Sequence, residues 1–125
     1  MKAYQRIAQT FVAYQNCVKN GNAEWERQHR EDIIHLAETY LPRGSGFDAG
    51  TIFDFEKSTP EKLVFETAFH HMDEYGGYCG WTAHLVIVRP SLVFGFDLRV
   101  TGKNKNGIKD YIGDVFHHAL EEDVK

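Results

Sequence analysis

The chain has 125 residues, enough for one hydrophobic core and too few for two ordinary domains, so we expect a single domain over residues 1–125. Hydrophobic residues make up 42% and charged residues 26%, a balance that excludes an intrinsically disordered chain. The formal charge of −4 excludes the strongly basic composition of a dedicated nucleic-acid-binding protein. Without a long apolar stretch or a signal peptide, and with two unrelated cysteines, the sequence predicts a soluble cytoplasmic protein with reduced thiols and no membrane contact.

Helical periodicity predicts an antiparallel hairpin of two helices at the start of the chain. The first helix, over roughly residues 2–19, should end at Asn20-Gly21, since both residues tolerate the left-handed conformation that ends helices. The second, over roughly residues 22–41, should begin at Asn22 and end before Pro42. The expected buried stripes are Tyr4, Ile7, Ala8, Phe11, Tyr14 and Val18 in the first helix, and Trp25, His29, Ile33, Leu36 and Tyr40 in the second.

Alternation of apolar and polar residues then predicts four strands. Residues 42–50 are expected to form a loop, followed by strands around residues 53–56, 62–70, 81–88 and 92–101. A last helix is expected over roughly 106–121. Its expected stripe is Ile108, Tyr111, Ile112, Val115 and Ala119. The sequence therefore predicts an α+β fold: an N-terminal helical hairpin, a four-stranded antiparallel meander and a C-terminal helix, with the helices on one face of the sheet.

The sheet face away from the helices is the first candidate site. Loop lengths predict that His84 lies opposite Asp97 and Thr82 opposite Arg99, with His70 diagonal to His84. We therefore expect His70, His84, Asp97, Arg99 and Glu66 to gather there, provided that no β-bulge interrupts the pleat. The full expected face is Asp54, Glu56, Lys62, Val64, Glu66, His70, Thr82, His84, Val86, Val88, Asp97, Arg99 and Thr101.

Two imidazoles and a carboxylate can bind a metal ion or transfer protons near neutral pH. His70, His84 and Asp97 are therefore candidate metal ligands, and a small metal-dependent hydrolase or nuclease is one alternative function. The simpler interpretation is a polar outer face with cross-strand ion pairs and no cofactor. The apolar part of that face, with Val64, Val86 and Val88, could also pair with a second copy of the chain in a homodimer.

Two further segments are candidate binding sites. The glycine-rich stretch before the third expected strand carries Tyr75, Tyr78 and Trp81, residue types that dominate protein–protein interfaces. Before the last helix, Lys103, Lys105 and Lys109 surround the expected helix N-terminus, where free N–H groups can bind phosphate or carboxylate. Nucleotide or nucleic-acid binding is thus a second alternative function, and a solvated turn is the simpler interpretation of the lysines.

Several strings in residues 42–112 carry a family resemblance: PRGSGFDAGT, FHHMDE, GWTAH and FGFDLRVTGKNKNGIKDY. Together they resemble small proteins of tailed bacteriophages and mobile elements, over somewhat more than half of the chain. The resemblance implies the cytoplasm of a bacterial host, and it assigns no site residues. It favours a non-enzymatic accessory protein that binds a host or defence-system macromolecule, with inhibition of that macromolecule as a further option. We therefore expect a protein partner, and we expect an enzymatic activity of this chain less than a binding role.

Overall fold

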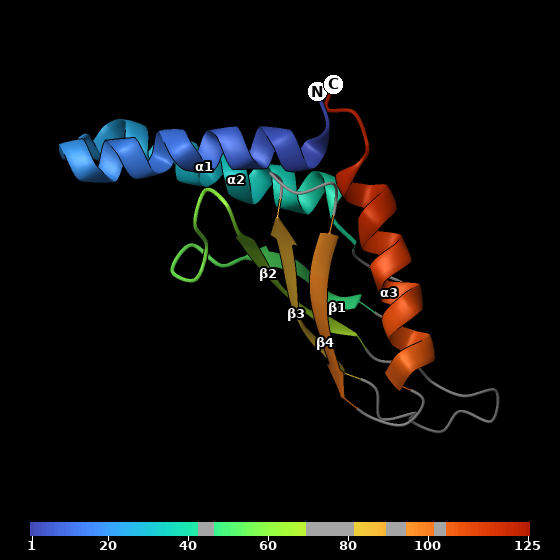
Figure 1. Cartoon of the computed structure of the whole chain (residues 1–125). Coiled ribbons are helices and arrows are strands. Elements are labelled where there is room, and N and C mark those ends of the chain that lie inside the picture. Colours follow the sequence, from blue (N-terminus) through green and yellow to red (C-terminus); the bar gives the residue numbers. More distant parts are fainter. Residues whose placement is uncertain (43–46, 70–81, 90–94, 102–104) are drawn as a thin grey trace.

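The computed structural model describes the backbone of residues 1–42, 47–69, 82–89, 95–101 and 105–125, and the side chains of residues 1–42, 51–67 and 110–125. Within these ranges, the elements in chain order are α1 (Ala3–Asn20), α2 (Ala23–Tyr40), β1 (Phe47–Phe53), β2 (Leu63–Phe69), β3 (Thr82–Arg89), β4 (Gly95–Thr101) and α3 (Lys105–Leu120) (Figure 1). The described strands pair antiparallel in the order β1-β2-β3-β4. The expected α+β class, with a helical hairpin before an antiparallel sheet and a helix after it, is confirmed.

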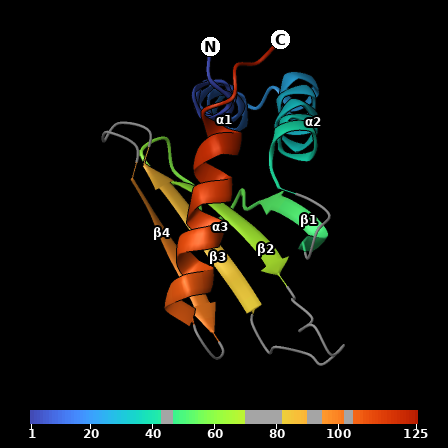
Figure 2. The ribbon, with the colours of Figure 1, turned by 90° about the vertical axis from the view of Figure 1, so that its right-hand side faces the viewer.

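The hydrophobic core lies where the described helices meet one face of the sheet. Figure 2 shows α3 in front of the sheet, with α1 and α2 side by side across its upper end. On the sheet side, the core contains Leu63 and Phe65 of β2, and Phe53 of β1, which is paired with Phe65. Directly paired and alternate residues share a face, so these three side chains define the core face. From the helices come Ile7, Phe11, Ile33, Leu36, Ala37, Ile112, Phe116 and Leu120.

Aromatic rings join the hairpin to the sheet. The ring centroids of Phe11 and Phe53 lie 5.3 Å apart, and those of Phe53 and Phe65 lie 5.4 Å apart, both in edge-to-face geometry. Beside them, the Phe55 ring contacts Tyr14 at 5.2 Å and carries the Arg30 guanidinium 4.2 Å above its centre. Such contacts add to the stabilisation by apolar burial. They fix where the hairpin sits on β1 and β2.

The turn between α1 and α2 follows the sequence signals closely. Gly21 has φ of 71°, in the left-handed region, and the N–H of Asn22 donates to the carbonyl of Cys17 at 2.9 Å. The side chain of Asn22 then accepts from the N–H of Trp25 at 3.3 Å and caps α2. The expected end of the first helix and start of the second are therefore confirmed. Cys17 itself is a half-buried free thiol.

Replacing Gly21 by alanine should destabilise the fold by about 1–2 kcal/mol, because a β-carbon disfavours the left-handed conformation. No atom lies within 4 Å of the position that this β-carbon would take, so the cost should be conformational rather than steric. Gly21→Asn should therefore lose less stability than Gly21→Ala, because asparagine tolerates this conformation better. Urea denaturation of both variants measures the difference, and equal losses would contradict this explanation.

Several residues expected in the buried stripes are exposed. Val18 is 48% and Trp25 55% exposed, near the hairpin turn, and Figure 1 shows this end of the hairpin extending beyond the sheet. His29, expected in the core, is half-buried and contacts Trp25 in a tilted arrangement, with ring centroids 5.8 Å apart. In α3, Tyr111 is 48% exposed, whereas Phe116 and Leu120, outside the expected stripe, are fully buried. Those predictions were wrong because burial depends on what lies opposite a helix face.

The first strand also differs from the expectation. β1 begins at Phe47, inside the segment expected to be a loop, and ends at Phe53. The side chain of Asp54 ends it by accepting the N–H groups of Glu56 at 3.0 Å and Lys57 at 2.9 Å. An Asx turn of this kind competes with strand geometry, so Phe55 packs on the hairpin from outside the strand. No helix in the described part of the chain is long and apolar enough to cross a membrane.

The two chain ends are bound to each other beside α1 (Figure 1). The N–H of Val124 donates to the carbonyl of Met1 at 2.8 Å, and Lys2 forms an antiparallel bridge with Asp123. Lys2 also forms an ion pair with Glu121. The hydrogen bond to Glu121 raises the pKa of the Lys2 ammonium group above its usual value. The C-terminal segment thus belongs to the folded domain.

Candidate functional site

The pairing of β2 with β3 decides which residues lie on the face away from the core. Phe65 pairs with Val86, and Glu66 pairs with Leu85. Because paired residues share a face, positions 86 and 88 belong to the core face, and positions 85 and 87 belong to the opposite face. The expectation that Val86 and Val88 lie on the outer face is therefore wrong, while the pairs shown do not include His84. A shift of one residue along a strand exchanges its two faces.

The pairing of β3 with β4 also differs from the expectation. Asp97 pairs with Ile87 and Arg99 with Leu85, rather than with His84 and Thr82. The last pair before the connection between β3 and β4 is Arg89 with Gly95, so this connection spans residues 90–94. It is longer than the sequence suggested, since the strands were expected at 81–88 and 92–101. The register also shifts between Ala83 and Leu85, around His84. The expected opposition of His84 and Asp97 is thus absent from this register.

The corrected register still brings two of the expected residues onto one face. Ile52, Glu66, Leu85 and Arg99 are paired in succession across the sheet and form one row. Strands are about 5 Å apart, so the backbones of Glu66 and Arg99 lie about 10 Å apart, with Leu85 between them. Val64, Ile87 and Asp97 form the next row. We call these two rows together the outer face.

Side chains of the outer face are described on β1 and β2. Ile52 is 60% exposed, the largest exposure among the large apolar residues that the structure describes. Beside it, the Glu66 carboxylate accepts from the Lys57 ammonium at 3.4 Å, and both side chains are about half exposed or more. Val64 is only 2% exposed. The described part of the outer face therefore combines an exposed apolar residue, a solvated ion pair and one buried valine.

The connection between β1 and β2 is hydrogen-bonded to the backbone of Val64, at the edge of this face. The hydroxyl of Ser58, which is buried, accepts the backbone N–H of Val64 at 2.9 Å. The N–H of Asp54 donates to the carbonyl of Val64 at 2.9 Å, which continues the pairing of β1 with β2. The backbone N–H and C=O of Val64 are thus both hydrogen-bonded, and this keeps the outer face in register at the start of β2.

Most other candidate residues lie where side chains are not described. His70, Tyr75, Tyr78, Trp81 and Lys103 fall outside the described residues altogether. For His84, Asp97, Arg99, Lys105 and Lys109, only the backbone is described, with the last two in the first turns of α3. Among the described side chains, no group of three or more His, Cys, Asp and Glu residues could hold a metal ion. The metal and anion sites therefore stay predictions.

The sequence interpretation missed Ile52, Leu85 and Ile87. Ile52 lay at the edge of a segment expected to be a loop, and Leu85 and Ile87 were assigned to the core because β3 is apolar on both faces. Residues 85–88 of β3 are all apolar, and a run of apolar residues carries no parity signal. Only its pairing with Glu66 and Asp97, on strands that do alternate, reveals its orientation.

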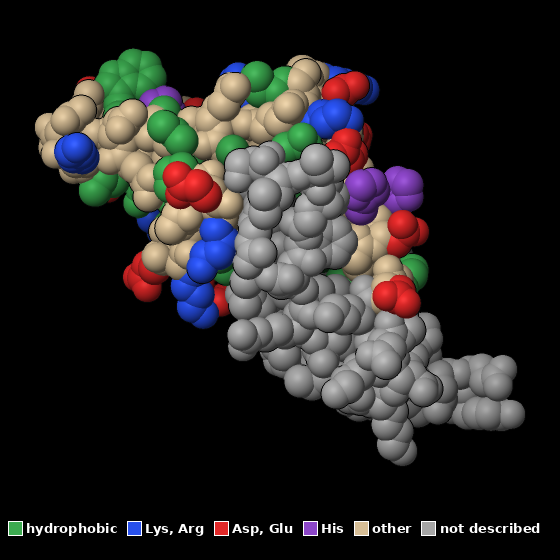
Figure 3. Space-filling model, viewed as in Figure 1, with side chains coloured by type: hydrophobic (Ala, Val, Ile, Leu, Met, Phe, Trp, Pro, Cys, Tyr) green, Lys and Arg blue, Asp and Glu red, His purple; other side chains and the backbone are tan. Residues whose placement is uncertain are grey.

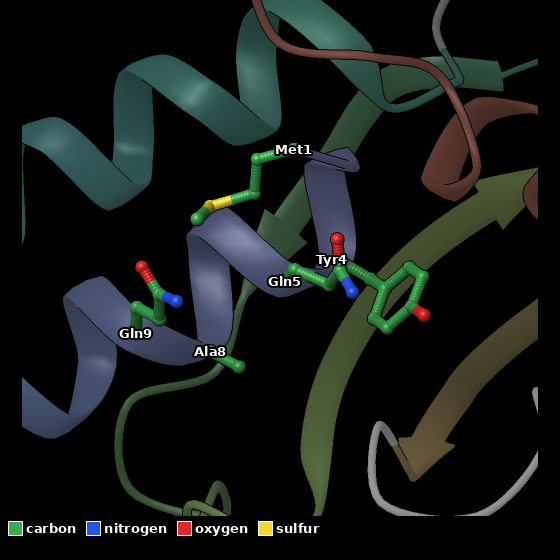
Figure 4. Close-up of a pocket in the computed structure, with 5 residues that line it drawn as sticks. All are labelled: Met1, Tyr4, Gln5, Ala8 and Gln9. Atoms are coloured by element: carbon green, nitrogen blue, oxygen red, sulfur yellow. The ribbon is translucent and has the colours of Figure 1, made fainter.

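Other surfaces offer less chemistry. A shallow hollow along α1 is lined by Met1, Tyr4, Gln5, Ala8 and Gln9, and its lining includes no histidine, cysteine, carboxylate or lysine (Figure 4).

Near the end of α3, the His118 ring lies 3.9 Å from the Asp114 carboxylate, and both side chains are over three quarters exposed. On the face that Figure 3 shows, the described side chains include both acidic and basic groups.

Comparison of the chain with models of protein families, with curated proteins and with solved structures finds no match.

Proposed function

We propose that this protein is a non-enzymatic binding protein that engages a macromolecular partner through its outer face. Following the resemblance to phage and mobile-element proteins, the partner would be a protein of the bacterial host or its defence machinery, and binding would inhibit it in the host cytoplasm. The observation that carries the proposal is Ile52, 60% exposed on the sheet face away from the described core.

The surroundings of Ile52 fit an interface. In its row, Glu66 and Arg99 are charged and Leu85 is apolar, and the next row contains Ile87 beside Asp97. Apolar positions flanked by charges of both signs are what a recognition surface needs, since apolar burial supplies affinity and charge placement supplies specificity. The sheet beneath is paired on both sides of Glu66, so such a surface would be rigid before binding.

The alternative functions gain less support. A hydrolase that uses His84 and Asp97 needs the two side chains together, and the register places Asp97 opposite Ile87 instead. Nucleotide or nucleic-acid binding would rest on Lys103, Lys105 and Lys109, whose side chains lie outside the described part of the structure.

Affinity capture from a host lysate with matched variants tests the proposal. Ile52→Lys places a charge at the exposed apolar residue on the β1 side of the proposed interface and should reduce recovery of a specific partner by about tenfold or more. Val12→Lys is the control, because Val12 is 41% exposed on α1, on a different surface. A partner that is retained by the wild type and by Val12→Lys but lost by Ile52→Lys supports the proposal. Equal recovery with Ile52→Lys, or loss with both variants, would contradict it.

A further inference from the structure

β4 is an edge strand of the described sheet, at the opposite end from β1. Among the described strands, β4 pairs with β3 only and ends the sheet. Figure 2 shows β4 as the outer strand, with α3 in front of the sheet. An edge strand presents unpaired backbone N–H and C=O groups that can pair with another strand. β4 has seven residues and contains no proline, and its two charged residues, Asp97 and Arg99, are of opposite sign.

The sequence of β4, GFDLRVT, is complementary to itself when two copies run antiparallel about Leu98. In that register, Asp97 of each copy faces Arg99 of the other, so two pairs of opposite charge form at once. Phe96 faces Val100, an aromatic and a β-branched residue, and Leu98 faces its own copy. Opposite charges and aromatic–β-branched pairs are favourable cross-strand neighbours. All seven residues of each strand are paired.

Neighbouring registers are unfavourable. A two-fold axis perpendicular to a sheet keeps each residue on its own face, and directly paired residues must share a face. The axis must therefore lie midway between the two copies of one residue, so that this residue pairs with its own copy. Centring the pairing on Asp97 sets that carboxylate against its own copy, and centring it on Arg99 sets two guanidinium groups together. Like charges directly opposite each other are destabilising. Among these three centres, Leu98 alone gives complementary charges.

We propose that a second copy of this chain pairs with the β4 edge in an antiparallel, two-fold symmetric arrangement centred on Leu98. The two sheets become one continuous sheet across the dimer. Because the axis is perpendicular to that sheet, the helices of both copies lie on one side and both outer faces lie on the other. The dimer would present two copies of the outer face side by side, and it would bind a symmetric or repeated partner with increased avidity.

Charge reversal on the full-length chain tests this register, with sedimentation equilibrium as the measurement. In a homodimer of Asp97→Arg, both cross-strand pairs become arginine against arginine, and in a homodimer of Arg99→Asp both become aspartate against aspartate. The dissociation constant of either homodimer should rise by about tenfold or more. An equimolar mixture of the two variants should recover a heterodimer, because every pair is again of opposite charge. The double variant, with the charges exchanged, should dimerise like the wild type.

Two controls separate this edge from other interfaces and from misfolding. Circular dichroism should show wild-type helix content in both single variants, and recovery of the heterodimer on mixing requires that both are folded. Ile52→Lys should leave dimerisation unchanged, since β1 lies at the opposite end of the sheet from β4. A wild-type chain that is monomeric at its highest soluble concentration would overturn the proposal, and so would single variants that dimerise normally. Loss of the dimer with Ile52→Lys would overturn it in favour of pairing through the outer face. An Ile52→Lys variant that loses partner capture but keeps the dimer would support both proposals, because it separates the outer face from the β4 edge.

Discussion

Replacing Phe11 by alanine is expected to destabilise the fold by about 3–5 kcal/mol, the usual cost of removing a fully buried aromatic ring. Phe11 is 0% exposed, and its ring contacts Phe53 of the sheet at 5.3 Å and Tyr14 of its own helix at 5.9 Å. Removing it leaves a cavity at the point where α1 meets β1. It also removes the edge-to-face contact that orients the hairpin on the sheet.

The adjacent residue provides a matched control. Val12→Ala also shortens a side chain in α1, but Val12 is 41% exposed, so its loss should change stability by no more than about 0.5 kcal/mol. Equilibrium unfolding in urea, followed by circular dichroism, measures both variants. Similar losses in the two variants would show that the α1 face seen here does not pack on the sheet.

A second large effect is expected at Ser58. Its hydroxyl accepts the N–H of Val64 at 2.9 Å, and the two residues are 5% and 2% exposed. Ser58→Ala removes the acceptor and leaves a buried backbone N–H without a partner, which should cost about 1–3 kcal/mol. Because this hydrogen bond holds the start of β2, the amide of Val64 should also exchange its hydrogen faster than in the wild type.

Thr59→Ala is the control for this position. Thr59 is exposed, and its turn with Lys62 is formed by backbone groups that alanine keeps. Its loss of stability should stay within about 0.5 kcal/mol. Denaturant unfolding gives the two losses, and hydrogen exchange followed by NMR gives the local effect. If Ser58→Ala were as stable as Thr59→Ala, the hydroxyl would not be the acceptor that stabilises this connection.

Local signals in the sequence predicted the helical hairpin well. Gly21 and Asn22 mark the end of α1 and the start of α2 because their preferences are carried by the residues themselves. Exposure along those helices was less predictable. Trp25 has the spacing of a buried residue, yet it is 55% exposed, because the helices are longer than the sheet beneath them is wide. The spacing of apolar residues along a helix does not indicate how far the sheet beneath that helix extends.

The outer face illustrates the same limit in the sheet. Alternation placed Glu66 correctly on the face away from the core, since its neighbours Phe65 and Thr67 are both buried. It failed for β3, where nearly every residue is apolar and the orientation depends on pairing with β2. The position of Asp97 relative to His84 depended on the length of a connection and on one register shift. The length of the connection and the register shift each depend on how two strands pair, so the sequence of one strand does not determine them.

The sequence by itself determined the α+β class, the order of helices and strands, and the residues that begin and end the hairpin, because these depend on local backbone preferences and on periodicity along one segment. Only the tertiary structure decided which face of β3 meets the core, that Asp97 lies opposite Ile87, and that β1 starts at Phe47. These features depend on hydrogen bonding between strands distant in sequence, where a shift of one residue exchanges the two faces at little cost in local preference.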